Sequence, residues 1–339
     1  MLTMKKILGC LAPGLLLAGL AACGGGSGNS STDNTGNTTS YTLPSWSVSI
    51  ATLPPKVTDS GATITLSATA SNHGAGATSY CFQGPFKEAP LYAEASCFAV
   101  AGTKTVERPG SPASYWLWVR DSAGYVGGPY RRDVGPCDSD GLAEASKYPS
   151  QPAVCVGIDR GQLVLLLEDS KAPLSVGNFL KYVNDGYYAG VVFHRIMKTF
   201  MVQTGGSTVN GNAFVSKTRT YAPIALEDTL KTGLLNVRGA LSMARTSDPD
   251  SASSEFFINT VNNTSLNTTS TTRSTSGTAP NTTTTCAGCG YAVFGRLLWG
   301  WETLDTLANF PVIANSSGEV SQPNPISSAP VIFWAYQIQ

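Results

Sequence analysis

The sequence predicts a mainly β protein in which a small β-sandwich precedes a closed antiparallel β-barrel capped by two helices. Short apolar runs rich in β-branched and aromatic residues recur along most of the chain, between connections rich in Gly, Pro and Asn. Only two segments, after Ser175 and after Trp301, repeat apolar residues at helical spacing. The chain has 339 residues, a length that favours two domains together with less structured segments.

The first domain is expected over residues 46–137. Thr63–Ala70 alternates apolar and polar residues, as a half-buried strand does, and Tyr115–Arg120 is aromatic and β-rich before a turn at Asp121–Gly124. Strands at this spacing favour a sandwich, and the stretch resembles bacterial immunoglobulin-like modules. No catalytic motif stands out in it. We interpret His73 as an exposed polar loop residue.

A polar stretch, residues 138–152, is expected to be a linker to a second domain over residues 153–339. We expect Ser175 to cap a helix that Gly186 closes, and a second helix over Trp301–Asn309. Strands of this domain are expected at Gln162–Leu167, Val191–Arg195, Met201–Gln203, Ala240–Met243, Phe256–Asn259 and Ala292–Leu297. A terminal strand, Val331–Gln339, would pair with the first strand of the domain. Many short strands with two helices suit a closed barrel.

The N-terminus indicates export. A short basic segment precedes the apolar run Ile7–Leu20, which is shorter than the ~20 residues that span a bilayer and is typical of a signal peptide. The run ends in Leu-Ala-Ala-Cys, which resembles the lipobox of bacterial lipoproteins, so residues 1–22 would be removed and Cys23 lipidated. Several acyl chains on Cys23 would anchor the protein in the cell envelope. Gly24 implies the outer membrane, facing the periplasm; the alternative is an ordinary cleavage site followed by a stray cysteine.

The composition after the lipobox indicates a tether and limits the partners. Residues 23–45 are mostly Gly, Ser, Asn and Thr, which bury too little apolar surface to fold, so we expect a flexible segment. The whole chain has 22 Lys and Arg against 22 Asp and Glu. This zero net charge gives no reason to expect a nucleic acid partner.

Six cysteines lie beyond Cys23, an even number that favours disulfides in an exported chain. Many pairings are possible; our working hypothesis is Cys81–Cys97, Cys137–Cys155 and Cys286–Cys289. The last pair, Cys-x-x-Cys, follows a Thr- and Asn-rich tract, which favours a structural loop staple over a redox pair. Half of a zinc site is the least favoured interpretation, because the sequence has no second such pair and no histidine cluster.

The most informative segment is Phe193–Gln203, FHRIMKTFMVQ. It joins one of only two histidines in the chain to an arginine and then to an aromatic–Met–Gln cluster. The segment resembles the active-site strands of the cyclophilins, the peptidyl-prolyl cis-trans isomerases. Further blocks resemble the same family in the same order: Ala172–Phe179, Gly239–Ala244, Glu255–Ile258 and Gly290–Arg296.

This resemblance implies a cyclophilin-like barrel and an isomerase that acts on X-Pro bonds of polypeptides without metal or cofactor. It implies that Arg195 is the catalytic residue, because an arginine can donate to the prolyl nitrogen as the amide twists and never deprotonates. It implies an apolar slot, a glutamine that bonds both the arginine and the substrate, and a backbone segment that holds the residue before proline. The substrate-binding candidates are His194, Phe200, Met201, Gln203, Ala244, Arg245, Glu255, Phe257, Leu266 and Tyr291.

Several positions depart from the family pattern. Glu255 stands where glutamine is usual and could pair with Arg195 or with Arg245, which itself replaces an asparagine. Ser265 falls where an aromatic residue often closes the slot, so we expect a shallower pocket and poor cyclosporin binding. A Thr- and Asn-rich insertion, residues 267–289, could form a disordered flap. The competing hypothesis is therefore a proline-segment binding or adhesion lipoprotein whose domain is catalytically weak.

Overall fold

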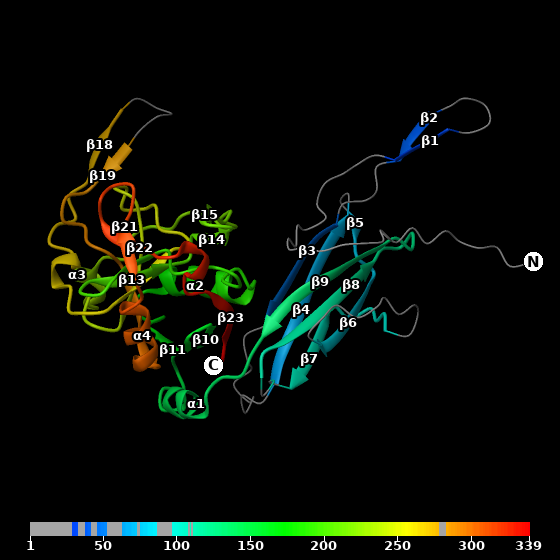
Figure 1. The fold of residues 1–339 in the computed structure, drawn as a ribbon, viewed down its shortest axis with the longest axis horizontal. Helices are drawn as coiled ribbons and strands as arrows, with labels where there is room; N and C mark the ends of the chain where they lie inside the picture. Colours follow the sequence, from blue (N-terminus) through cyan, green and yellow to red (C-terminus); the bar gives the residue numbers. More distant parts are fainter. Residues whose placement is uncertain are drawn as a thin grey trace, which may run out of the picture. The chain divides into compact units, whose positions relative to one another are not determined.

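The computed structural model describes residues 29–32, 38–41, 46–52, 63–72, 75–86, 97–107, 109, 111–277 and 283–339 (Figure 1). The chain divides into two compact units, residues 1–45 and 46–339. The expected signal peptide, Cys23 and His73 lie outside the described residues. In the expected tether, β1 (Asn29–Thr32) and β2 (Thr38–Tyr41) pair antiparallel, so this segment contains short strands where we expected none. Among the described residues, no helix is long and apolar enough to cross a membrane.

The second unit begins with two antiparallel sheets. One contains β3 (Trp46–Thr52), β4 (Thr63–Asn72), β5 (Ala75–Gly76) and β7 (Thr103–Glu107). The other contains β6 (Ser79–Phe86), β8 (Ala113–Arg120) and β9 (Val126–Val134). Ile64 and Leu66 of the first sheet share one buried cluster with Leu117 and Val119 of the second. The two sheets therefore pack face to face; the immunoglobulin likeness stays a prediction.

The expected linker contains a helix, α1 (Ser139–Ser146), that the sequence analysis missed. Its N-cap, Asp138, accepts a hydrogen bond from the Asp140 backbone at 2.9 Å. Gly141 is buried on α1, and a side chain there would meet Val164. Residues 138–152 hold few apolar side chains, so this one small buried face is a weak signal in the sequence.

The remaining residues form an eight-stranded antiparallel sheet with the order β12-β13-β17-β16-β20-β11-β10-β23. Its strands are β10 (Ala153–Ile158), β11 (Gly161–Leu167), β12 (Arg195–Met197), β13 (Met201–Thr204), β16 (Ala240–Met243), β17 (Phe256–Asn259), β20 (Val293–Trp299) and β23 (Ile332–Gln337). The terminal strand pairs with the first strand of this domain, as predicted.

The two edges of this sheet do not join in a ladder. In the described part of the chain, one isolated bridge between Val192 and Val331 connects the segments that precede β12 and β23. The strand expected at Val191–Arg195 therefore begins only at Arg195. The reason is that the backbone before it bonds to two different segments: Val192 N donates to Ser207 O, and Phe193 N donates to Pro330 O. The sheet curls, but full barrel closure is not confirmed.

Two helices flank the sheet, α2 (Pro173–Asn184) and α4 (Trp301–Ala308). The predicted cap of α2 was wrong, because the helix begins at Pro173 and Ser175 is buried in its first turn. The Glu227 carboxylate instead accepts from the backbone N–H groups of Leu174 and Ser175, at 2.9 and 2.8 Å. Proline favours the first helical position because it has no N–H to satisfy. Gly186, with φ of 73°, follows the end of α2 as expected.

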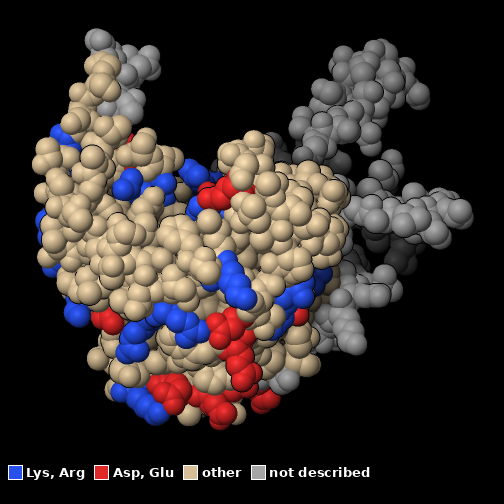
Figure 2. Space-filling view, turned by 60° about the vertical axis from the view of Figure 1, so that its left-hand side comes forward, with Lys and Arg blue, Asp and Glu red and all other residues tan. Residues whose placement is uncertain are grey.

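Shorter elements complete the domain. They are α3 (Thr229–Thr232), the 3-10 turns η1 (Thr264–Leu266) and η2 (Ile326–Ser328), and the strand pairs β14 (Ser207–Asn210) with β15 (Ala213–Ser216), β18 (Ser274–Ser276) with β19 (Thr283–Thr285), and β21 (Val312–Ala314) with β22 (Val320–Pro323). The β18–β19 pair projects from the body of the domain (Figure 1). Charged side chains are sparse and of mixed sign on the face in Figure 2, in keeping with the low charge content.

The β-sandwich and the eight-stranded sheet share a buried core. Trp334 of β23 packs against Gly135 and Gly157, where a Cβ atom would clash with its ring. The Tyr336 hydroxyl donates to the Gly135 carbonyl at 2.8 Å. Arg132 of β9 is buried, and its Nη2 lies 3.4 Å from each of three acceptors: Thr52 Oγ1, Val183 O and Ala335 O. Burial lowers the pKa of Arg132 to about 10, so it stays charged at neutral pH.

The described residues contain three disulfides, Cys81–Cys97, Cys137–Cys155 and Cys286–Cys289, which are the pairs of our working hypothesis. The second joins the chain just after the sandwich to β10. It therefore links the sandwich covalently to the eight-stranded sheet, beside the shared core that contains Trp334.

We expect Trp334→Ala to lower the free energy of unfolding by about 3 kcal/mol, because it opens a cavity in the shared core. Trp334 is only 5% exposed. Chemical denaturation followed by circular dichroism measures this loss.

The neighbouring residue on the same strand is a matched control for that prediction. Phe333 is 44% exposed, so Phe333→Ala should cost less than about 1 kcal/mol. Equal losses for the two variants would contradict a shared core at Trp334.

Candidate functional site

The candidate site lies on one face of three neighbouring strands. Arg195 of β12 is in register with Gln203 of β13, which is in register with Phe257 of β17. Successive side chains of a strand point to opposite faces, so Met201, two residues before Gln203, shares their face. The intervening residues, Ile196, Val202 and Ile258, are fully buried in the main hydrophobic core. The FHRIMKTFMVQ segment therefore builds the core with one face and the candidate site with the other.

Arg195 is held by an acid that the sequence analysis did not identify. Its Nε donates to Glu319 Oε2 at 2.7 Å and its Nη2 donates to Oε1 at 2.5 Å, a bidentate ion pair. Its Nη1 donates to Gln203 Oε1 at 3.4 Å and lies 4.0 Å from the sulfur of Met201. The predicted Arg195–Gln203 contact is therefore present. The Arg195 side chain is 32% exposed, so it remains accessible from solvent.

Glu319 stands in the turn between β21 and β22, 124 residues from Arg195. Its carboxylate also accepts a hydrogen bond from the Ser321 hydroxyl at 2.7 Å. Its backbone N–H donates to the Asn315 side chain at 3.0 Å. The hydrogen bond from Arg195 is the main cause that lowers the pKa of Glu319 to about 2, so the ion pair persists throughout the neutral range.

Glu255 pairs with neither of the arginines that we expected. Its Oε2 accepts from Gln203 Nε2 at 2.9 Å and lies 3.5 Å from His194 Nε2, while its Oε1 lies 3.5 Å from Arg219. Arg195 is already engaged by Glu319 on the far side. The anion at this position therefore joins a polar network through Gln203. Arg219, on the loop after β15, is a neighbour that the motif did not reveal.

The surroundings of His194 favour its uncharged form. Burial is the largest cause and lowers its pKa, Glu255 opposes that effect, and the charge of Arg195 adds to it. The imidazole is therefore uncharged at pH 7. Its ring lies 6.4 Å from that of Phe214 on β15, in an edge-to-face arrangement.

Aromatic and apolar side chains surround the arginine. The guanidinium carbon of Arg195 lies 5.9 Å from the centre of the Phe200 ring. Met201 and Phe257 are buried in the sheet face, and the Phe257 ring meets that of Tyr291 edge-on at 5.6 Å. The Phe200 carbonyl accepts hydrogen bonds from Asn263 Nδ2 at 2.6 Å and Thr260 N at 3.0 Å.

Arg245 binds the Gly290–Tyr291 segment, whose tyrosine ring contacts Phe257. Its Nε and Nη2 donate to the Gly290 carbonyl at 2.9 and 2.7 Å, and its guanidinium lies 4.7 Å from the centre of the Tyr291 ring. Ala244 N donates to Glu255 O at 3.0 Å, which continues the strand pairing past β17. Leu266 of η1 joins the same segment through its carbonyl, which accepts from Tyr291 N at 3.0 Å. Ser265 is exposed beside it.

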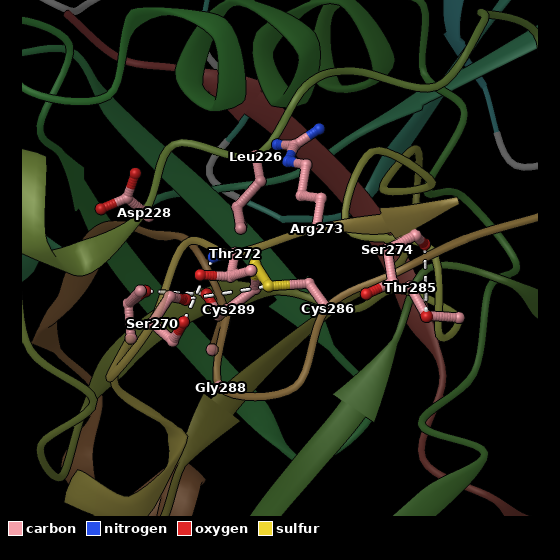
Figure 3. The surroundings of a disulfide bond; sticks show 12 residues. Leu226, Asp228, Ser270, Thr272, Arg273, Ser274, Thr285, Cys286, Gly288 and Cys289 are labelled. Carbon is pink, nitrogen blue, oxygen red and sulfur yellow. Dashed lines mark hydrogen bonds between the residues drawn. A yellow bond between two sulfur atoms is a disulfide. The ribbon is translucent and has the colours of Figure 1, made fainter. Parts of the chain in front are cut away.

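The insertion, residues 267–289, contains the β18–β19 pair where we expected a disordered flap. The Cys286–Cys289 disulfide lies at its base, with the sulfur of Cys286 3.8 Å from the Ser270 carbonyl oxygen (Figure 3). Arg273 forms an ion pair with Asp250. No group of three or more His, Cys, Asp or Glu side chains that could hold a metal ion occurs among the described residues.

Comparison with known proteins identifies the family that this region resembles. Residues 153–331 match the family model described as cyclophilin type peptidyl-prolyl cis-trans isomerase/CLD. A peptidyl-prolyl cis-trans isomerase of Acinetobacter baylyi is 40% identical over 44% of this chain and 69% of its own length. A peptidyl-prolyl cis-trans isomerase of Streptomyces antibioticus is 39% identical over 51% of this chain and 93% of its own length.

A solved structure is also similar to this chain. It is a cyclophilin type peptidyl-prolyl cis-trans isomerase of Cryptosporidium parvum, 25% identical, with a TM-score of 0.40. The match covers 55% of this chain and 97% of that one.

The burial of His194 can be tested by measuring the pKa of its imidazole. We expect its imidazole to titrate below the value of about 6.5 of an exposed histidine, because burial disfavours the charged form. The chain has two histidines, so His73→Ala leaves one imidazole signal for NMR titration.

Glu255→Gln should lower the pKa of His194 further, since it removes the negative charge that favours the imidazolium. Asp305→Asn, at a surface ion pair with Arg238, should leave it unchanged. A midpoint at or above that of an exposed histidine would contradict the described burial.

Proposed function

The chain belongs to the cyclophilin-type peptidyl-prolyl cis-trans isomerases, and on that premise we propose that Arg195 catalyses X-Pro isomerisation in extracytoplasmic polypeptides. Peptidyl-prolyl cis-trans isomerase activity is the established activity of the family. The single observation that supports the catalytic assignment is the clamped guanidinium of Arg195 on the same sheet face as Gln203, Met201 and Phe257.

The reaction requires no nucleophile and no proton transfer. Rotation about an amide must overcome the loss of its resonance, a barrier of about 18–20 kcal/mol. A catalyst therefore needs to bind the twisted amide better than either planar form. As the amide twists, the prolyl nitrogen becomes pyramidal and regains a lone pair, which a fixed cationic donor can bond.

The residues of the site suit this task. Arginine presents its donors in a rigid planar fork, and the fork of Arg195 is fixed along one edge by Glu319. The neighbouring Met201, Phe257 and Phe200 are apolar groups against which a proline ring would pack. Gln203 bonds Arg195 through its oxygen and Glu255 through its nitrogen, so both of its polar atoms are oriented. His194, neutral at pH 7, would orient neighbours rather than carry charge.

Two features support an extracytoplasmic location. The N-terminal sequence has the pattern of a lipoprotein signal ending at Cys23. The six cysteines beyond Cys23 form three disulfides, which persist in oxidising compartments. We therefore propose that the enzyme is anchored by lipid at Cys23, at the periplasmic face of the outer membrane. There it would assist folding by accelerating isomerisation that otherwise takes tens of seconds or more.

The second candidate function is capture of proline-containing segments without useful turnover. Three departures from the family pattern favour this alternative, at Arg245, Glu255 and Ser265. The two functions differ in one measurable respect. A binder would retain proline peptides without accelerating their isomerisation, whereas an enzyme turns them over.

We expect Arg195→Ala to reduce kcat/KM by about 100-fold in a protease-coupled assay on a proline tetrapeptide, because it removes the donor to the prolyl nitrogen. Wild-type protein should show activity well above the uncatalysed rate. Wild-type protein that binds the peptide but shows only background turnover would establish the alternative function.

Arg238→Ala is the matched control. Arg238 is another partly exposed arginine with an acidic partner, Asp305, and an aromatic neighbour, Trp301. It lies outside the candidate site, so its removal should leave kcat/KM within about twofold of the wild type.

The anchor has its own test. Cys23→Ser should move the protein from the membrane fraction to the soluble periplasmic fraction, because it removes the acylated thiol. Metabolic labelling with a fatty acid should mark the wild type and not the variant. Equal membrane retention and equal labelling of both proteins would contradict lipidation at Cys23.

A further inference from the structure

We propose that Glu319 is a positioning residue that fixes the Arg195 guanidinium for catalysis. The inference deepens the proposed function and rests on it. It comes from the bidentate ion pair, whose two bonds of 2.7 and 2.5 Å engage Nε and Nη2 of Arg195.

The Arg195–Glu319 ion pair determines which nitrogen of the guanidinium remains available to a substrate. A guanidinium has five N–H groups in a rigid planar fork, and two parallel bonds to a carboxylate fix the orientation of that plane. Glu319 occupies the Nε–Nη2 edge, so Nη1 is the nitrogen left beside Met201 and Gln203. The bond from Nη1 to Gln203, at 3.4 Å, is longer than those to Glu319. Glu319 therefore orients the fork, and Nη1 stays free enough to bond a substrate.

Glu319 is itself held in place. Its Oε2 accepts from the hydroxyl of Ser321, a residue that is 1% exposed. The Asn315 side chain accepts from the Glu319 backbone and lies 3.4 Å from the Ser321 hydroxyl. The β21–β22 turn thus supplies a fixed anion to the strand that carries Arg195. A fixed anion on the far edge of the fork positions the cation without covering its Nη1 nitrogen.

The position of the acid argues against an inhibitory role. An inhibitory carboxylate would have to block Nη1, the nitrogen beside Met201 and Gln203. Glu319 instead binds Nε and Nη2, and Nη2 also lies 3.5 Å from the sulfur of Met197. The ion pair lowers the net charge at the site, but it removes the conformational freedom of a long side chain, which catalysis by fixed donors requires.

Kinetics of a double-variant cycle test the proposal. Glu319→Gln should lower kcat about tenfold with KM changed less than twofold, since orientation affects the twisted state more than ground-state binding. In an Arg195→Ala background, Glu319→Gln should have no further effect, because the residue acts through Arg195. Asp305→Asn, which removes the acid of another surface ion pair, is the control and should leave kcat unchanged.

Ser321→Ala provides a second variant if Glu319→Gln folds poorly. It keeps the ion pair but removes the hydroxyl that holds Glu319, so kcat should fall by a smaller factor, about twofold to threefold. An increase in kcat for Glu319→Gln would overturn the proposal in favour of an inhibitory contact. An equal loss in the Arg195→Ala background would reduce Glu319 to a structural role and overturn it as well.

A measurement independent of turnover separates this inference from the proposed function. The Arg195 Nε–H proton should exchange with water more slowly in the wild type than in Glu319→Gln, as measured by NMR of the arginine Nε–H signals. Inactive wild-type protein would overturn the proposed function, and the exchange comparison would still decide whether Glu319 fixes Arg195. Equal exchange rates in the two proteins would overturn the positioning role.

Discussion

In β12, β13 and β17 each side chain must point to the opposite face from its neighbours, and the structure of the site depends on this alternation. Ile196, Val202 and Ile258 go inward and are fully buried in the main core. Arg195 and Gln203 go outward, where their registered pairing brings the guanidinium to the amide. A one-residue slip in register would exchange the two sets and destroy the core and the site together. The candidate site is therefore as strongly specified as the hydrophobic core beneath it.

On this sheet face, charged and polar side chains form one continuous network of hydrogen bonds and ion pairs. Glu319 bonds Arg195, Arg195 bonds Gln203, and Gln203 bonds Glu255, which lies between His194 and Arg219. Each of the two acids lies beside an arginine, and His194 stays uncharged because of its burial. The carboxylate of Glu255 finds its partners within this network. Glu255 binds Gln203, and the Arg195 guanidinium is bound by Glu319 instead.

The sandwich and the isomerase domain are not independent bodies within residues 46–339. Trp334 and Tyr336 of the terminal strand contribute to the same buried cluster as Leu117 of the sandwich, and the Cys137–Cys155 disulfide spans the junction. The charged Arg132 is buried here among three acceptors that come from both parts. Because a buried charge without acceptors is strongly unfavourable, these bonds favour one fixed arrangement of the two parts.

The sequence by itself determined what depends on local pattern. The strands Ala240–Met243 and Phe256–Asn259 occur where short strand-like runs predicted them, and the FHRIMKTFMVQ motif indicated the family. Short-range signals fail where distant segments compete for the same groups: Glu227 supplies the cap that Ser175 was expected to supply, and β12 begins only at Arg195. The partner of Arg195 was decided by tertiary structure alone. Glu319 lies 124 residues away, in a turn whose sequence has no catalytic pattern, and only the packing of that turn brings its carboxylate to the guanidinium.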